Sequence, residues 1–191
     1  MSNNIYLKKG LDIPLEGAAA LNTRKVIAPD IIAVKPTDFR GLVPKLLVRE
    51  GDKVLAGTPV MADKMAQDIL FASPVSGEER KLLEIRIKAD QTQEYVDFGA
   101  KSPADLDAEA IKSALLKGGL WPAIIQRPYG IIANPEVKPK AIFVSAFNTA
   151  PLAADMEYVL RDEFADIQAG VNALNKLTDG GVHMSFDGAN Y

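Results

Sequence analysis

One loop in the sequence combines residue types that suit a ligand: Phe147, Asn148, Thr149 and Pro151. It follows an apolar run over residues 139–146, which predicts a strand covered on both faces. Ligands of open α/β sheets bind beyond the carboxyl ends of strands, where Asn148 and Thr149 would offer polar groups. These four residues are therefore the candidate ligand-binding residues. A turn that caps the following helix explains them equally well.

The sequence lacks the residues that a typical zinc site, a thiol nucleophile or a Ser/His/Asp triad would need. The chain has no cysteine, which excludes disulfides, a thiolate nucleophile and cysteine-held zinc or iron–sulfur sites in this segment. His183 is the sole histidine, so it anchors neither a typical zinc site nor a Ser/His/Asp triad, and it reads as a packed or surface strand residue. Five acids are spread over predicted helix and indicate a solvated face: Asp155, Glu157, Asp162, Glu163 and Asp166. We predict no catalytic residue and no metal site.

Two further features could in principle hold a cofactor. Gly118 and Gly119 could approach a phosphate, but no further glycine pair follows, which favours a helix C-cap. Trp121 and Tyr129 could stack on a quinone or flavin ring, yet Trp121 beside Pro122 is more typical of a core residue.

The elements that must position these residues fall into two segments. Up to residue 99, short apolar pieces alternate with dense glycine and proline turns, which predicts a compact β-sandwich. From residue 100 the pattern becomes helical. Ser102 and Pro103 predict a helix start with Leu106 on its buried face, and Gly118-Gly119 predicts its end.

The second segment reads as a strand–helix–strand unit. Five apolar residues at spacings of three and four predict a helix with one buried face, ended by the glycines at 180 and 181: Phe164, Ile167, Val171, Leu174 and Leu177. Residues 182–186 read as the next strand. We expect an α/β domain over residues 100–191 that is incomplete at its C-terminus, because two parallel strands cannot cover their own faces.

Bulk composition narrows the function classes. Hydrophobic residues make up 48% of the chain and charged residues 25%, with a net charge of −3. No block of Lys or Arg stands out that could neutralise a run of phosphates, so we expect no nucleic-acid partner. The N-terminus lacks a signal-peptide core and the longest apolar stretch is shorter than a membrane span, which predicts a cytoplasmic or peripheral protein.

Residues 48–60 followed by 73–77 resemble the biotinyl/lipoyl-like sandwich, also called the barrel-sandwich hybrid, and we place this domain at residues 1–99. In carrier proteins of that fold, a lysine between two methionines carries the cofactor. Here Asp63 precedes Lys64, and Lys64 lies too far from Gly77, so we read Lys64 as a solvated turn residue. A lipoyl-like carrier or interaction module is one alternative function.

A wider resemblance covers essentially the whole chain and rests on five motifs in order: residues 8–15, 35–39, 118–122, 126–129 and 142–153. Together they are similar to the A subunits of Na⁺-pumping NADH:quinone reductases. The fold this resemblance implies is the β-sandwich followed by a small Rossmann-like α/β domain. Family members carry a longer insertion after residue 78, so we expect residues to be missing between Gly77 and Lys81.

The resemblance also implies a role. Proteins of this family lie on the cytoplasmic face of a bacterial inner-membrane complex that couples NADH oxidation and ubiquinone reduction to sodium export. They dock onto the other components, especially the membrane B subunit, and are associated with ubiquinone. FMN, FAD and an iron–sulfur centre belong to those other components, and this chain would bind no cofactor of its own. A more distant likeness to the flavin-binding component of respiratory NADH dehydrogenases leaves a flavin-dependent NADH oxidoreductase as a second alternative.

Overall fold

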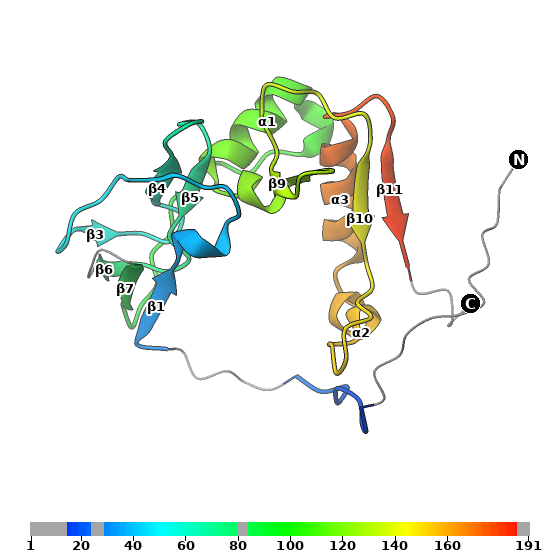
Figure 1. Cartoon of the computed structure of the whole chain (residues 1–191), viewed down its shortest axis with the longest axis horizontal. Helices are drawn as coiled ribbons and strands as arrows, with labels where there is room; N and C mark the ends of the chain where they lie inside the picture. Colours follow the sequence, from blue (N-terminus) through cyan, green and yellow to red (C-terminus); the bar gives the residue numbers. More distant parts are fainter. Residues whose placement is uncertain (1–14, 24–28, 80–83, 187–191) are drawn as a thin grey trace, which may run out of the picture.

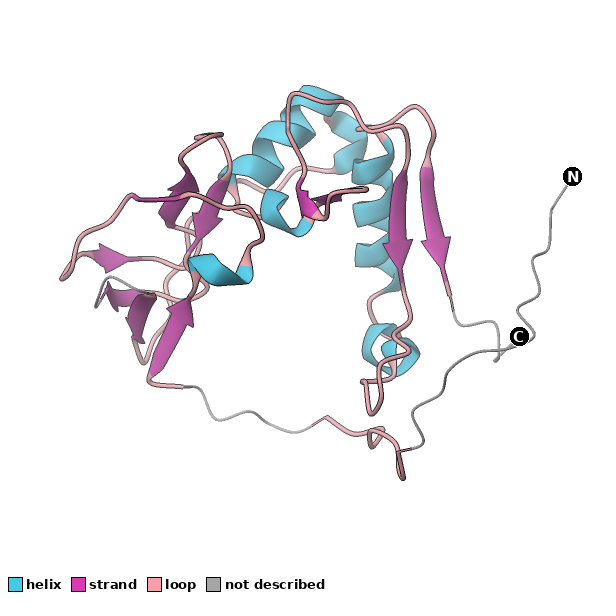
Figure 2. Cartoon of the chain, viewed as in Figure 1, coloured by secondary structure: helices cyan, strands magenta, loops and turns pink. Residues whose placement is uncertain are grey.

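The structure is a computed structural model that describes residues 15–23, 29–79 and 84–186. Before residue 97 the regular structure consists of strands and one short 3₁₀ helix, η1 (Pro36–Asp38), whereas helices and further strands follow from residue 103 (Figure 2). This change agrees with the change of sequence pattern near residue 100. The domain boundary at 99/100 itself stays a prediction.

Two antiparallel sheets build the first part. One has the strand order β1 (Ile31–Val34), β7 (Ile85–Ala89), β6 (Gly77–Glu79) and β3 (Lys53–Val54). The other has the order β2 (Pro44–Leu46), β4 (Pro59–Asp63) and β5 (Leu70–Ala72). Apolar residues from both sheets are buried in one cluster: Val54, Val60, Met61, Phe71, Ile85 and Ile87. The predicted β-sandwich is confirmed. The expected gap between Gly77 and Lys81 falls largely on residues 80–83, outside the described residues.

The second part is built around a parallel strand pair. β10 (Ile142–Ser145) pairs with β11 (Val182–Ser185), with Ile142 opposite Val182. Between them the chain forms α2 (Met156–Leu160) and α3 (Phe164–Asn175), which is the predicted strand–helix–strand unit. Five elements precede it in the chain: η2 (Pro103–Asp105), α1 (Ala108–Lys117), η3 (Trp121–Ala123), β8 (Ile125–Gln126) and β9 (Ile131–Ile132).

The first helix begins later than predicted. The Ser102 hydroxyl accepts a hydrogen bond from the Ala104 amide at 3.3 Å, but it caps only the 3₁₀ turn η2. Leu106 then adopts extended backbone, and the Asp107 carboxylate accepts the Ala110 amide at 2.8 Å to start α1. A charged acceptor forms the shorter, stronger cap, so the helix starts there. The prediction that Leu106 belongs to this helix is wrong, although Leu106 does pack, partly buried, against the core cluster.

The end of α1 is as predicted. Gly119 has φ +69°, the left-handed conformation that glycine adopts without a Cβ penalty. Its amide donates to the Leu116 carbonyl at 3.2 Å, and the Leu120 amide donates to the Leu115 carbonyl at 2.9 Å. These two bonds form a Schellman motif. The glycine pair therefore serves as a helix stop, as the sequence indicates.

The strand pair has an open face, which corrects the prediction of a strand covered on both sides. Burial alternates along β10, and Phe143 is 77% exposed. Its ring stacks on His183 of β11 with centroids 5.0 Å apart. Among the described residues, α3 lies along one face of the pair (Figure 1), and the Phe143–His183 face is bare. His183 is thus the surface strand residue that the sequence allows.

Helix α3 also differs from the prediction at both ends. It ends at Asn175, capped by Lys176, instead of continuing to the glycines at 180 and 181. Phe164, expected on the buried face, is 70% exposed, whereas Leu177 beyond the helix is 8% exposed. Near the C-terminal end of the helix, Ala173 and Leu174 pack against the core cluster, whereas Phe164 in the first turn stays largely exposed.

One hydrophobic cluster joins the two parts. Ile111, Trp121 and Leu177 of the second part belong to the same buried cluster as the sandwich core. The Trp121 indole N–H donates to the Ala133 carbonyl at 2.7 Å, so its polar atom is satisfied inside this core. A Cβ at Gly119 would lie 2.7 Å from the Cβ of Ala72 on β5, which marks a close backbone approach between the parts.

Candidate functional site

The candidate loop follows β10 directly, and two side-chain hydrogen bonds hold it. The Ser145 hydroxyl donates to the Phe147 carbonyl at 3.0 Å, and the Asn148 side chain accepts the Ala150 amide at 2.9 Å. Neither Asn148 nor Thr149 caps the next helix, because the Asp155 carboxylate does so by accepting the Tyr158 amide at 3.1 Å. The alternative explanation of the loop as a helix cap is therefore wrong.

A cavity of about 560 Å³ opens beside this loop. The loop forms one wall, α2 and α3 form another, and β11 with the residue after it closes the third. The lining residues are Ala146, Phe147, Asn148, Ala153, Ala154, Asp155, Met156, Glu157, Leu160, Phe164, Ile167, Gln168, Val171, Met184 and Phe186. Two of the four predicted residues, Phe147 and Asn148, line it. Thr149 and Pro151 are exposed and do not.

The cavity lining is mostly apolar, with carboxylates and no cationic side chain. Phenylalanine, methionine, leucine, isoleucine and valine side chains supply most of it, and Asp155 and Glu157 are its charged groups. A phosphate or another anion would find no Lys or Arg partner in this lining. The cavity therefore suits an uncharged ligand with a large apolar surface, and Asn148 and Gln168 offer amide groups to its polar atoms.

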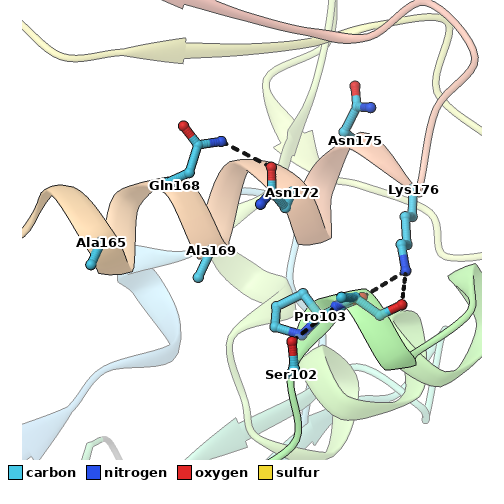
Figure 3. Close-up of a pocket in the computed structure, with 9 residues that line it drawn as sticks. Ser102, Pro103, Ala165, Gln168, Ala169, Asn172, Asn175 and Lys176 are labelled. Carbon is cyan, nitrogen blue, oxygen red and sulfur yellow. Dashed lines mark hydrogen bonds between the residues drawn. The ribbon is translucent and has the colours of Figure 1, made fainter.

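A second hollow of about 510 Å³ lies between η2 and α3. Figure 3 shows Lys176 at the end of α3 reaching across to η2, while Gln168 and Asn172 bond to each other along the helix at 2.9 Å. The Lys176 ammonium donates to three carbonyls, those of Pro103 at 2.6 Å, Ala104 at 3.0 Å and Leu106 at 2.6 Å. The lysine thus ties α3 to the segment that precedes α1.

Replacing Lys176 by methionine is expected to lower the free energy of unfolding by about 1–2 kcal/mol, because three carbonyls lose a charged donor at a partly solvated site. Urea denaturation followed by circular dichroism measures this. The matched control is Lys101→Met, a change at an exposed loop lysine near the same turn, for which we expect a change within about 0.5 kcal/mol. Equal effects of the two substitutions would contradict the stabilising role of the three Lys176 hydrogen bonds.

The remaining candidates lie away from the cavity lining. Trp121 is 5% exposed and belongs to the core, whereas Tyr129 is 67% exposed. Lys64 is an exposed residue in the turn after β4.

On α1, which contributes nothing to the cavity lining, a hydrogen bond from Lys112 to Glu109 at 2.9 Å raises the pKa of Lys112 above its ordinary value.

Residues that the sequence pattern did not indicate come mainly from the helices. Met156 and Leu160 of α2 and Ile167 and Val171 of α3 supply much of the apolar lining. In the described ranges, no group of three or more His, Asp or Glu side chains is placed to hold a metal ion. Within these same ranges, every helix is too short or too polar to span a bilayer.

Two models from one protein family match the chain. The model described as the NqrA N-terminal barrel-sandwich hybrid domain matches residues 5–90. The model described as the NqrA second alpha/beta domain matches residues 106–190. Both descriptions agree with the folds of the two parts described above.

Several curated relatives are named as the A subunit of the Na(+)-translocating NADH-quinone reductase. The one from Yersinia pseudotuberculosis serotype O:1b (strain IP 31758) is 34% identical over 190 residues, which cover 94% of this chain and 42% of that protein. The one from Serratia proteamaculans (strain 568) is 34% identical over 192 residues, or 94% of this chain and 43% of that protein. The one from Rhodopirellula baltica is 34% identical over 190 residues, which cover 93% of this chain and 42% of that protein. The chain thus spans less than half the length of these relatives.

Proposed function

Because the chain belongs to the family of the A subunit of the Na(+)-translocating NADH-quinone reductase, and matches its N-terminal part, we propose that it is a non-catalytic docking component of such a complex. The observation that carries the proposal is the match of both domains in order along the chain. The complex would couple NADH oxidation and quinone reduction to sodium export. This chain would bind other subunits on the cytoplasmic face of the membrane, with the membrane B subunit as the principal neighbour.

The redox chemistry is assigned to other subunits. An iron–sulfur centre is held mainly by cysteine thiolates, and this sequence has none. FMN and FAD carry phosphates, which are commonly bound by glycine-rich loops at helix N-termini. Here the glycine pair forms the C-terminal stop of α1 instead, with the Gly119 amide bonded to Leu116. NADH, FMN, FAD and the iron–sulfur centre would therefore act elsewhere in the complex.

The quinone contact is assigned to the loop with Phe147, Asn148, Thr149 and Pro151 and to the adjoining cavity. A quinone is uncharged and has a flat ring with an apolar tail, and the cavity lining is apolar and lacks cations. The Phe147 ring can lie against a quinone ring. The Asn148 amide lies at the same wall and can donate to a quinone carbonyl.

Equilibrium dialysis with a short-tailed ubiquinone tests this assignment. Replacing Phe147 by alanine is expected to weaken quinone binding roughly tenfold, because an aromatic contact and its buried area are lost. The matched control is Phe143→Ala, which removes an exposed phenylalanine of β10 that does not line the cavity and should leave quinone binding unchanged.

Two outcomes would overturn the proposal. If Phe147→Ala binds quinone as the unaltered chain does, the loop is not the quinone contact. If the purified chain carries stoichiometric flavin, visible in its absorbance near the flavin maximum, the chain holds a redox group and is not a mere docking component.

A further inference from the structure

Three exposed phenylalanines surround the cavity. Phe147 is 36% exposed, Phe164 is 70% exposed and Phe186 is 54% exposed, and all three line the cavity. We call them the phenylalanine rim. An apolar surface of this kind, gathered at a cavity and left in water, marks a binding surface more often than chance exposure does.

The loop beside the rim shows backbone strain. Leu152 has φ +58°, in the left-handed region that residues with a side chain rarely adopt, and it is 57% exposed. It precedes Ala153, which lines the cavity. Left-handed backbone is unfavourable at a residue other than glycine, and such strain concentrates at functional sites. Here the strained residue presents an apolar side chain to solvent next to the rim.

Carboxylates gather beside the rim, since Asp155 and Glu157 line the same cavity and Glu163 and Asp166 flank Phe164 in the sequence. Residues 155–166 contain five carboxylates and one basic residue, Arg161. The Arg161 guanidinium stacks over the Tyr158 ring at 3.9 Å and pairs with Asp162 at 3.3 Å. It is therefore already engaged within the segment. The field around the rim repels anions such as lipid phosphates and attracts lysine and arginine.

We infer that the phenylalanine rim docks a basic amphipathic helix of a partner protein in the complex. The apolar face of such a helix would cover the three rings, and its lysines or arginines would meet the carboxylates of residues 155–166. A bilayer surface fits poorly, because the cytoplasmic leaflet is itself anionic. The inference rests on the proposed function, since it names the kind of partner segment that closes the mouth of the proposed quinone cavity.

A model peptide tests the inference without a quinone present. The probe is a fluorescent helical peptide of about 18 residues, with leucines on one face and lysines on the other. Fluorescence anisotropy should show saturable binding to the unaltered chain that weakens as salt is added. A peptide of the same composition in scrambled order, without an apolar face, should bind at least roughly tenfold more weakly.

Charge neutralisation near the rim is the decisive variant. The triple change Glu157→Gln, Glu163→Gln and Asp166→Asn should weaken peptide binding roughly tenfold, because it removes three of the attracting charges. Its matched control removes the same charge from exposed acids of the sandwich part: Glu50→Gln, Asp68→Asn and Asp90→Asn. The control should bind the peptide as the unaltered chain does. Phe164→Ser should weaken binding without altering the circular dichroism spectrum, because this ring is mostly solvated.

Three results would overturn the inference. The first is equal binding of the ordered and scrambled peptides. The second is an equal loss of peptide binding in the triple variant near the rim and in the control triple variant. The third is tighter binding of the chain to phosphatidylserine vesicles than to the peptide. Failure of quinone to bind in the dialysis experiment, with peptide binding intact, would remove the proposed quinone contact and leave this docking surface standing.

Discussion

Replacing Trp121 by alanine is expected to destabilise the chain by about 3–5 kcal/mol. Trp121 is 5% exposed and belongs to the buried cluster that runs from the sandwich into the helical part. Removing the indole empties a large volume at the place where the two parts share their core. It also removes the donor that satisfies the Ala133 carbonyl at 2.7 Å. Guanidinium denaturation followed by circular dichroism measures the loss.

Two variants separate the contributions at this position. Trp121→Phe keeps much of the ring but leaves the Ala133 carbonyl without its donor, so we expect a smaller loss of about 1–3 kcal/mol. Tyr129→Ala removes an aromatic ring that is 67% exposed, and its effect should stay within about 0.5 kcal/mol. If Trp121→Ala and Tyr129→Ala cost the same, Trp121 does not hold the shared core together.

The order of elements was predictable because it depends on local signals. Turn residues between short apolar pieces indicated the sandwich, and the three-and-four spacing of Ile167, Val171 and Leu174 indicated α3. The stop at Gly118 and Gly119 followed from backbone chemistry alone, since a left-handed residue is needed there. Each of these features is decided within a few residues.

Element boundaries and exposure were less predictable, because they depend on competing caps and on packing. Ser102 and Asp107 both carry capping side chains, and only the geometry shows that the carboxylate starts the α-helix. Phe164 belongs to the apolar stripe of α3, but it is 70% exposed and lines an open cavity instead of the core. Periodicity reports which face is apolar, not which part of that face is covered.

The rule that ligands bind after strand ends predicted the candidate loop from the sequence, but it did not predict the cavity beside the loop. A position after a strand end pointed to Phe147 and Asn148. The other walls come from α2, whose five residues are too few to show a helical period, and from α3, which is distant in sequence. Only the three-dimensional structure brings Met156 and Val171 to the same cavity.

Gly119→Ala is expected to destabilise the chain by about 2–4 kcal/mol, through two separable effects. The first is local, because alanine at φ +69° adopts a left-handed conformation that costs about 1–2 kcal/mol. The second is a clash between the parts, because the new methyl group would lie 2.7 Å from the Ala72 Cβ and 2.8 Å from its amide nitrogen. The Ala72 amide nitrogen is a backbone atom of β5 and the Ala72 Cβ is fixed directly to that backbone, so relief requires the two parts to move apart.

Gly99→Ala separates the two effects, because Gly99 has φ +70° and no atom lies within 4 Å of the place where its methyl group would stand. This control carries the backbone cost alone, so the difference between the two variants in urea denaturation measures the clash. We expect that difference to be about 1–3 kcal/mol. Equal losses would show that the approach of Gly119 to Ala72 is not needed for stability. A larger loss for Gly119→Ala would mean that one glycine serves both as the helix stop and as the contact that lets the sandwich and the α/β part share a core.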